Sequence, residues 1–369
     1  MTDQSADRSF MALALALGRR GLGNTWPNPS VGAVLVRPDD GQPVIVGRGW
    51  TQPGGRPHAE IEALRRAGAA ARGATLYVTL EPCSHHGKTP PCADAIVAAG
   101  VTRVVSALED PNPEVAGQGH GRLHAAGIAV EVGLGAEQAR RDHAGHLRRM
   151  RDGRPHVTLK LAVSADHKAG LAGRRPAAIT GEATRARVHR LRAMNDAILV
   201  GIGTVLADDP QLTCRLPGME ALSPVRVVLD ARLRLPPDRT LATSARATPV
   251  WVVAAPDAPA EAERALRELG VEVLRTPAQA GRLDLAAVLR MLAGRGITRL
   301  MVEGGPTVAA AFVAADLVDA AALFRSPKTI GPDGVDALEG MRLETMTARL
   351  KALGREPVGE DSVEFFERA

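Results

Sequence analysis

The sequence predicts an α/β protein of two domains, and three observations support this fold class. Short runs rich in β-branched residues alternate with segments of helical spacing along most of the 369 residues, which is the pattern of an α/β fold. A chain of this length can form two packed domains. Near residue 150 the sequence becomes ARRDHAGHLRRMRDGRP, a basic segment that we interpret as a solvated helix face and linker rather than a binding patch. We therefore expect domains at 1–150 and 151–369.

The first domain is expected to contain strands and helices in alternation. Strands are indicated at 31–36, 43–49, 75–80, 103–108 and 128–132, and helices near 10–18, 58–71, 90–99, 118–126 and 136–149. The apolar run FMALALALG follows Asp7 and Arg8 and gives way to Arg19 and Arg20. No recognisable cleavage site follows this run, so we interpret it as a capped helix and not as a signal peptide.

The second domain continues the alternation, without a sequence repeat of the first. The expected strands are HVTLKLAVS, DAILVG, VRVVLD, VWVVAA, VEVLR and ITRLMVEGG. In LVGIGTVLADDP, Leu206 stands at the third glycine position of a GxGxxG fingerprint, so a Rossmann dinucleotide site is not indicated. After the last strand, Gly304 to Thr307 open a helix whose free backbone N–H groups suit phosphate oxygens; a plain strand-to-helix turn is the alternative.

Composition limits the classes of partner. The formal charge is +5 and the pI is about 9.5, but the excess arginine lies in an Ala-, Gly-, Arg- and Pro-rich composition. Nine aromatic residues supply few base-stacking platforms, so we expect small anionic ligands and no nucleic acid. No stretch approaches the roughly 18 apolar residues of a membrane span. Three cysteines, two of them clustered, favour a metal or catalytic site in a reducing compartment, and we expect the cytoplasm.

Two short segments contain candidate metal ligands. RPHAEIEALRRAG places His58 and Glu60 in the first turn of a helix, and TLEPCSHHGKTPPC contains Cys83 and Cys92. One imidazole and two thiolates leave the fourth tetrahedral position of Zn²⁺ open, which is the arrangement of a catalytic zinc site. The alternative is a buried histidine with two small core cysteines.

His-x-Glu followed by Pro-Cys and a second cysteine is the signature of the zinc-dependent nucleobase deaminases. In this chemistry zinc lowers the pKa of bound water from 15.7 to about 7. Glu60, which is not a ligand, would carry the proton from that water to the leaving ammonia. Eight residues, SHHGKTPP, separate the two cysteines, where nucleoside and tRNA deaminases have two. The longer loop indicates a segment that contacts the substrate.

With PNPSVGAVLV before this loop and EDPNPEVAGQG after it, residues 1–150 resemble the deaminase half of the bifunctional riboflavin biosynthesis deaminase/reductase. The resemblance implies a cytidine-deaminase-like three-layer fold, zinc ligands His58, Cys83 and Cys92, and Glu60 as the acid/base. It also implies substrate contacts at Asn28, His85, Lys88, Asp110 and Asn112. The sequence has Thr51 where many relatives have histidine.

KLAVSAD, LRAMNDAILVGIGTVLADDPQLTCR and VEGGPT resemble the reductase half of the same family, which has a dihydrofolate-reductase-like fold. The resemblance implies NADPH contacts at Ala162, Ala178, Thr204, Asp208, Gly305, Pro306 and Thr307. It implies substrate contacts at Arg192, Leu212, Arg215 and Glu303. Arginine suits a sugar phosphate because its guanidinium group binds phosphate with two hydrogen bonds. The chain departs from the family at His167, where glycine is common, and at Pro176–Ala178, where Ser-x-Trp is common.

We therefore expect a bifunctional enzyme of riboflavin biosynthesis that binds one Zn²⁺ per chain, uses NADPH and forms a homo-oligomer. It would deaminate 2,5-diamino-6-ribosylamino-4(3H)-pyrimidinone 5′-phosphate and then reduce the ribosyl group to ribityl. Two alternatives stay open at this point. One is a tRNA or nucleoside deaminase fused to an unrelated domain, and the other is a non-catalytic zinc-stabilised binding module.

Overall fold

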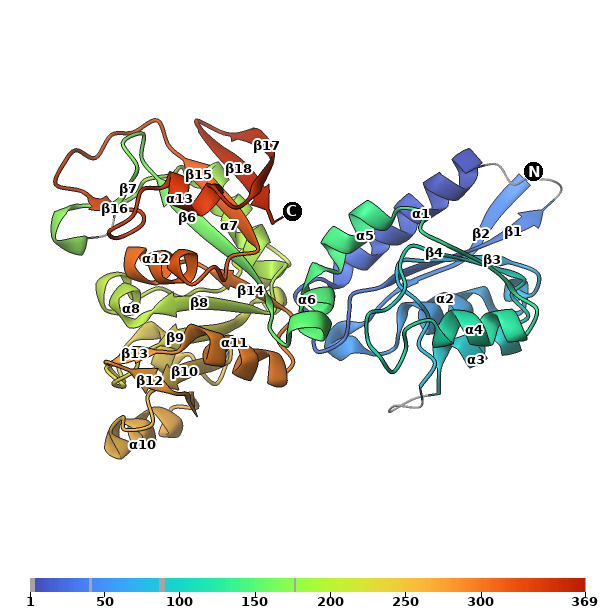
Figure 1. The fold of residues 1–369 in the computed structure, drawn as a ribbon, viewed down its shortest axis with the longest axis horizontal. Coiled ribbons are helices and arrows are strands. Elements are labelled where there is room, and N and C mark those ends of the chain that lie inside the picture. Colours follow the sequence, from blue (N-terminus) through green and yellow to red (C-terminus); the bar gives the residue numbers. More distant parts are fainter. Residues whose placement is uncertain (1–3, 40–41, 86–89, 176, 369) are drawn as a thin grey trace. The chain divides into compact units, whose positions relative to one another are not determined.

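The computed structural model describes residues 4–39, 42–85, 90–175 and 177–368. The chain divides into two compact units, Met1–Gly153 and Arg154–Ala369. The division falls three residues after the boundary placed at 150 from the sequence. Figure 1 shows a sheet with helices packed against it in each unit, so the predicted α/β class is confirmed.

The first unit is built on a five-stranded mixed sheet. Its strands are β1 (Gly32–Asp39), β2 (Gln42–Trp50), β3 (Thr75–Val78), β4 (Arg103–Ser106) and β5 (Ala129–Val132). Their order is β2-β1-β3-β4-β5. β1 pairs antiparallel with β2 and β3, whereas β3, β4 and β5 are mutually parallel neighbours. The carboxyl ends of β3 and β4 therefore lie at the same edge of the sheet.

Helices cover both faces of this sheet. They are α1 (Gln4–Gly18), α2 (Ala59–Ala67), α3 (Cys92–Ala98), α4 (Gln118–Ala125), α5 (Ala136–Asp142) and α6 (Ala144–Asp152). α1 and α5 lie on one face, and α2, α3 and α4 on the other (Figure 1). The result is the three-layer arrangement that the sequence predicted.

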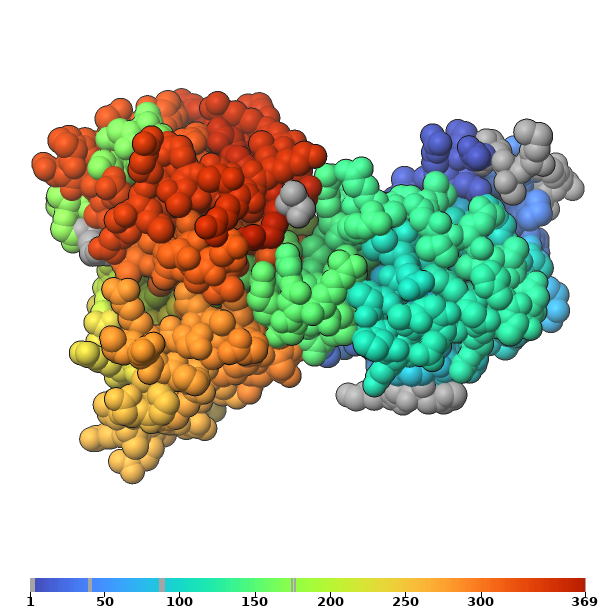
Figure 2. All heavy atoms as spheres, in the orientation of Figure 1, coloured from blue at the N-terminus to red at the C-terminus, as the bar shows by residue number. Residues whose placement is uncertain are grey.

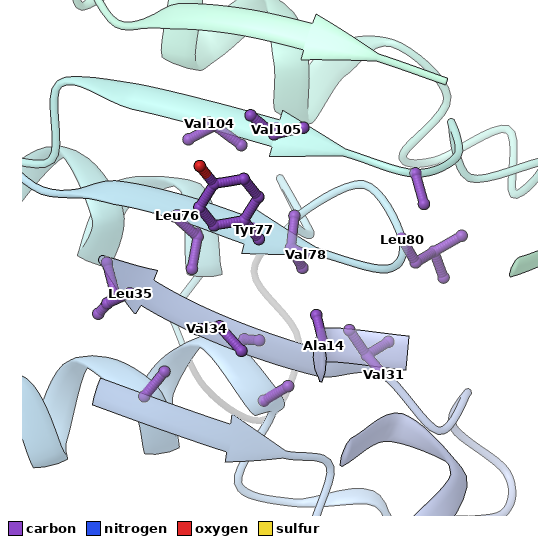
Figure 3. Packing of buried hydrophobic residues seen from close by; sticks show 14 of the residues in the cluster. Ala14, Val31, Val34, Leu35, Leu76, Tyr77, Val78, Leu80, Val104 and Val105 are labelled. Atoms are coloured by element: carbon purple, nitrogen blue, oxygen red, sulfur yellow. The ribbon is translucent and has the colours of Figure 1, made fainter. Parts of the chain in front are cut away.

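The sequence of α2 accounts for its position at the metal site. Glu60 and Glu62 lie in its first turn and Arg65 and Arg66 in its last, which is the favourable charge order for a helix dipole. The helix ends at Gly68, and its N-terminal end begins immediately after His58. The sheet-facing core beneath it contains the buried residues Leu35, Leu76 and Val104 from three neighbouring strands (Figure 3).

The second unit contains a nine-stranded sheet, in the order β11-β10-β9-β8-β14-β6-β15-β18-β17. These strands are β6 (His156–Val163), β8 (Ala197–Gly201), β9 (Val225–Leu229), β10 (Val250–Ala254), β11 (Glu272–Arg275), β14 (Arg299–Val302), β15 (Ala320–Arg325), β17 (Lys351–Val358) and β18 (Asp361–Glu367). The pairs from β11 to β15 are all parallel, and β18 and β17 add an antiparallel hairpin. β14 lies between β6 and β8, so strand order reverses there, and such a point in an α/β sheet is where ligands bind.

Short strands and helices complete this unit. The strands are β7 (Lys168–Gly170), β12 (Ala278–Gln279), β13 (Arg282–Leu283) and β16 (Val335–Asp336). The helices are α7 (Glu182–Ala193), α8 (Ile202–Asp208), α9 (Thr240–Thr243), α10 (Ala260–Glu268), α11 (Leu285–Gly294), α12 (Pro306–Ala314) and α13 (Glu344–Thr347). Figure 2 shows the red C-terminal strands at the surface of the unit, in agreement with the exposure of nearly all of β17.

One helix and several strands differ from the sequence prediction. The segment 136–149 forms two helices and not one, because His143 leaves helical geometry between them. The buried His143 ring contacts Thr79 Oγ1 at 3.1 Å, which ties this break to the end of β3. The predicted strands include no counterpart of β15, of the C-terminal hairpin β17–β18 or of the short strands β7, β12, β13 and β16. No helix of the described residues is both long and apolar enough to cross a membrane.

Candidate active sites

Three elements bring His58, Cys83 and Cys92 together in the first unit. His58 immediately precedes α2, Cys83 lies in the segment after β3, and Cys92 begins α3. One ligand atom of each side chain lies within 4.8 Å of the others. The three residues therefore form one cluster, as the sequence predicted, even though 34 residues separate the first from the last.

The orientation of the donors suits a metal ion. His58 Nδ1 lies 3.3 Å from Cys92 Sγ and 3.7 Å from Cys83 Sγ, and the Cys92 N–H group donates to Cys83 Sγ over 3.2 Å. The hydrogen bonds from Cys92 and His58 lower the pKa of Cys83 to about 4. The hydrogen bond with Cys83 and burial raise the pKa of Cys92. One imidazole and two sulfur donors fit the donor preference of Zn²⁺.

Glu60 lies in the first turn of α2, beside the cluster, and is almost fully buried, with 3% of its surface exposed. Its carboxyl group is in hydrogen-bonding contact with Cys92. Burial raises the pKa of Glu60, because an ionised carboxylate is costly away from water. A carboxyl group with a raised pKa beside a metal cluster has the property that a general acid/base needs.

Asn28 approaches His58 from the side opposite to the cysteines. Its Nδ2 lies 3.4 Å from His58 Nε2 and donates to Gly55 O over 2.8 Å. Gly55 has a φ of +84°, and a Cβ atom there would lie 2.8 Å from the Asn28 side chain. The absence of a side chain at Gly55 therefore lets Asn28 pack against His58, the predicted metal ligand.

The other predicted substrate contacts of this unit have different surroundings. Asp110 is buried, and its Oδ1 accepts hydrogen bonds from Asn112 N and His146 Nε2, both at 2.9 Å. Asn112 in turn accepts from Glu114 N over 3.1 Å. These contacts shape the loop after β4. His85 is exposed beside Cys83, and Lys88 lies outside the described residues.

Glu81 is a residue of this site that sequence reasoning did not find. Its side chain is fully buried, and its oxygens accept the N–H groups of Asp110, Gly117 and His120, each at 3.1 Å. It therefore fastens the loop after β4 to the segment that carries Cys83. Its position directly before Pro82 and Cys83 is the one signal for this residue in the sequence.

The second unit contains a cavity of about 540 Å³. Residues of β6, β8 and β14 or just beyond their carboxyl ends line it, among them Lys160, Gly201 and Glu303. This is the reversal point of the sheet. All seven residues that the sequence analysis assigned to NADPH line the cavity, namely Ala162, Ala178, Thr204, Asp208, Gly305, Pro306 and Thr307.

The cavity edge near α12 has features that suit a phosphate group. Pro306 occupies the start of the helix, and the first turn of α12 contains no acidic residue. Gly304 has a φ of +86°, a conformation that side chains disfavour, and Gly305 N donates to Thr204 Oγ1 over 2.9 Å. The turn is thus held against α8 at the edge of the cavity.

Three charged residues converge in the cavity. Arg192 Nε and Nη2 donate to the two oxygens of Glu303 over 2.7 and 3.0 Å, and Lys160 Nζ lies 3.9 Å from Glu303 Oε2. Burial acts to raise the pKa of Glu303, but the charges of Arg192 and Lys160 outweigh it and hold the pKa at about 2. Burial lowers the pKa of Lys160. Lys160 was not predicted as a site residue, because the alternation of apolar and polar residues in HVTLKLAVS indicates only that its side chain lies on one face of a strand.

The two arginines expected to bind the sugar phosphate differ in the structure. Arg192 is occupied by Glu303 and by Thr213 O at 3.1 Å. Arg215 is exposed and has only Gln211 Oε1 and Thr213 Oγ1 near its Nη1, at 3.3 and 3.4 Å. Leu212 is buried and lines the cavity, whereas Arg215 is not among its lining residues.

Comparisons with known proteins agree with both sites. Residues 4–108 match the cytidine and deoxycytidylate deaminase zinc-binding region, and residues 155–363 match the RibD C-terminal domain. The riboflavin biosynthesis protein RibD of Escherichia coli is 42% identical over 91% of this chain and 92% of that protein. The RibD of Aquifex aeolicus is 40% identical over 98% of both chains.

Solved structures lead to the same family. Acinetobacter baumannii RibD superposes with a TM-score of 0.86 at 38% identity, covering 98% of this chain and 99% of that one. A diaminohydroxyphosphoribosylaminopyrimidine deaminase/5-amino-6-(5-phosphoribosylamino)uracil reductase of Thermotoga maritima gives 0.84 at 34% identity, with the same coverage.

The fold and sites define a two-domain enzyme, a zinc-dependent deaminase joined to a reductase. The chain belongs to the RibD family of bifunctional riboflavin biosynthesis proteins. The match over residues 155–363 excludes an unrelated second domain, and the enzyme family excludes a non-catalytic zinc module.

Proposed function

We propose that the chain deaminates 2,5-diamino-6-ribosylamino-4(3H)-pyrimidinone 5′-phosphate and then reduces the ribosyl group of the product to ribityl with NADPH. The observation that carries the first step is the His58, Cys83 and Cys92 cluster with buried Glu60 beside it. The converging Lys160, Glu303 and Arg192 in the cavity of the second unit support the second step. The Thermotoga maritima relative carries both activities in its name.

In the deaminase site, His58, Cys83 and Cys92 would hold Zn²⁺. When bound, the ion acidifies a water molecule and so makes hydroxide accessible near neutral pH. Glu60 would take the proton of this water and deliver it to the departing amino group. The raised pKa of Glu60 supports this role, because its carboxyl group can hold a proton at a pH where an exposed glutamate would not.

The substrate contacts of this site follow from position. Asn28 lies beside His58, and Asn112 lies on the loop that Glu81 and Asp110 hold in place. We propose that Asn28, His85, Lys88, Asp110 and Asn112 contact the pyrimidine or its ribose phosphate. Asp110 would in addition fix the Asn112 backbone, since its Oδ1 accepts the Asn112 N–H group over 2.9 Å.

In the reductase site, NADPH supplies a hydride when it is bound against Ala162, Ala178, Thr204, Asp208 and Gly305–Thr307. Reduction breaks the C1′–O4′ bond of the ribosyl group: C1′ gains the hydride and O4′ gains a proton. We propose that Lys160 donates this proton, since burial lowers its pKa and so makes the ammonium group a stronger acid. Glu303 would hold Lys160 in position, while Arg192 holds Glu303.

Three further expectations belong to this proposal. Arg215, whose guanidinium group has no carboxylate partner among the described residues, would contact the sugar phosphate together with Leu212. The enzyme would act in the cytoplasm, in keeping with its three free cysteines. It would form a homo-oligomer and would bind neither nucleic acid nor membranes.

The test is incubation of the full chain with the pyrimidinone phosphate, with and without NADPH. We expect ammonia release in both cases, and oxidation of NADPH only after ammonia release has begun. Elemental analysis should find one zinc per chain, and the Cys83→Ser, Cys92→Ser double variant should lose it. Full zinc retention in that variant would contradict the ligand assignment, and ammonia release without any NADPH oxidation would contradict the second step alone.

A further inference from the structure

Among the charged residues that line the reductase cavity, cations outnumber anions. Four are cationic, Lys160, Arg175, Arg185 and Arg192, and two are acidic, Asp208 and Glu303. Glu303 pairs with both Arg192 and Lys160. Asp208 has no ion-pair partner among the described residues, and burial raises its pKa. Arg175 and Arg185 therefore have no carboxylate partner among the described residues.

Arg185 lies on the same helix, α7, as Arg192 of the charged cluster in the cavity. Arg185 precedes Arg192 by seven residues, which is close to two helical turns, so both side chains leave the same face about 10 Å apart along the axis. Arg185 Nη1 donates to Thr180 O over 3.4 Å. This is a weak contact, and it leaves the other edge of the guanidinium group open to a ligand.

Arg175 lies at the other end of the segment that precedes α7. Its Nε donates to Ala172 O over 3.3 Å, and its side chain is exposed. The lining residues between the two arginines, Ala177, Ala178, Ile179 and Thr180, offer no carboxylate. Lys328 Nζ donates to Ala178 O over 3.3 Å and adds a third positive charge beside this segment.

Two other arginines of α7 have carboxylate partners. On α7, Arg187 pairs with Glu356 at 3.0 Å and Arg192 pairs with Glu303 at 2.7 Å. Arg175 and Arg185 differ in that they line the cavity and contact only backbone carbonyl groups within the described structure. A guanidinium group with free N–H donors at the edge of a ligand cavity is suited to a phosphate, which it can bind with two parallel hydrogen bonds.

We propose that Arg175 and Arg185 form a phosphate-binding subsite at the exposed edge of the reductase cavity, additional to the residues predicted from the sequence. This inference rests on the proposed function, since both reductase ligands carry a phosphate monoester. The monoester is the 5′-phosphate of the pyrimidine substrate or the 2′-phosphate of NADPH. The chemistry recognised is the same in either case, and the ligand pairs below distinguish the two.

The experiment uses the full chain and the variants Arg175→Gln, Arg185→Gln and the double variant. Arg190→Gln is the matched control, because Arg190 is an exposed arginine of the same helix that does not line the cavity. Calorimetric titration gives the Kd of NADPH and NADH, and of the deaminated pyrimidine with and without its 5′-phosphate. Circular dichroism and turnover at saturating ligand establish that each variant is folded.

We expect the double variant to bind one phosphorylated ligand about 10-fold to 150-fold more weakly, the range of a charge-assisted hydrogen bond, with its unphosphorylated counterpart unchanged. A loss confined to NADPH identifies the 2′-phosphate, and a loss confined to the phosphorylated pyrimidine identifies the 5′-phosphate. The subsite is overturned if affinity falls equally for the phosphorylated and unphosphorylated member of each ligand pair, or if it falls no further than in Arg190→Gln. In either case, turnover by the native chain would still support the proposed function. If the native chain binds neither NADPH nor the phosphorylated pyrimidine, both proposals fail.

Discussion

Glu60 and Glu303 lie at the centres of the two sites, yet their pKa values move in opposite directions. Burial raises the pKa of Glu60, which has no arginine or lysine contact in the described structure. Burial acts in the same sense on Glu303, but Arg192 and Lys160 overcome it and hold the pKa at about 2. The first carboxyl group retains a proton more readily than an exposed glutamate does, and the second loses its proton more readily. The same residue type is thus a proton carrier in one unit and an electrostatic anchor in the other.

The largest expected effect tests the proton carrier. Glu60→Gln preserves the size of the side chain but cannot transfer a proton, so ammonia release should fall by roughly 10²–10⁴-fold. Zinc content, measured by elemental analysis, should stay at the native level. Reduction of the already deaminated pyrimidine should continue at the native rate. Loss of both activities in a folded, zinc-loaded variant would show that the two sites are not independent.

A second substitution tests the anchor. Glu303→Gln leaves Arg192 and Lys160 buried without their anion, so we expect the free energy of unfolding of the second unit to fall by about 3–5 kcal/mol. Urea denaturation monitored within that unit measures the change. In the Arg192→Met, Glu303→Gln double variant the loss should be smaller than the sum of the single losses, because the two groups form one pair. Strict additivity would mean that the pair is not coupled.

The pH dependence of this stability sharpens the contrast. Glu303 has a folded-state pKa of about 2 against an ordinary value of 4.5. A depressed pKa stabilises the fold where the carboxylate is ionised, so the advantage of the native chain over Glu303→Gln should be complete above about pH 4.5. It should diminish as the pH falls toward about 2. Denaturation at several pH values checks this, and a difference that instead grows on acidification would contradict the anchor role.

The smallest expected effect concerns an exposed ion pair in the first unit. Arg122 on α4 pairs with Asp94 on α3 at 2.8 Å, with both side chains more than two-fifths exposed. Arg122→Gln should change the free energy of unfolding of this unit by only about 0–1 kcal/mol, since solvent screens exposed charges. Addition of salt should remove most of the difference. A loss of stability as large as that of Glu303→Gln would show that solvent exposure does not account for the difference between the Arg122–Asp94 and Arg192–Glu303 ion pairs.

Much of the deaminase site could be predicted from the sequence. Zinc requires few donor types, and His58, Cys83 and Cys92 lie in two short segments whose local structure is simple, a helix start and the loop after a strand. The cavity-lining positions of the reductase unit, such as Thr204 and Gly305, were found through family resemblance rather than through residue chemistry. Their assignment to NADPH stays a prediction.

The sequence by itself determined the alternation of strands and helices and the residue types of the metal cluster, because both depend on periodicity and on donor chemistry over short distances. Only the tertiary structure decided the partners of charged groups. It joined Arg192 to Glu303 across 111 residues, inserted β14 between β6 and β8, and buried Lys160 against that pair. It also gave Glu81 its three backbone donors, and within the described part of the chain it placed no carboxylate beside Arg175 or Arg185. Electrostatic pairing depends on distance and burial in three dimensions, and neither quantity is contained in residue spacing along the chain.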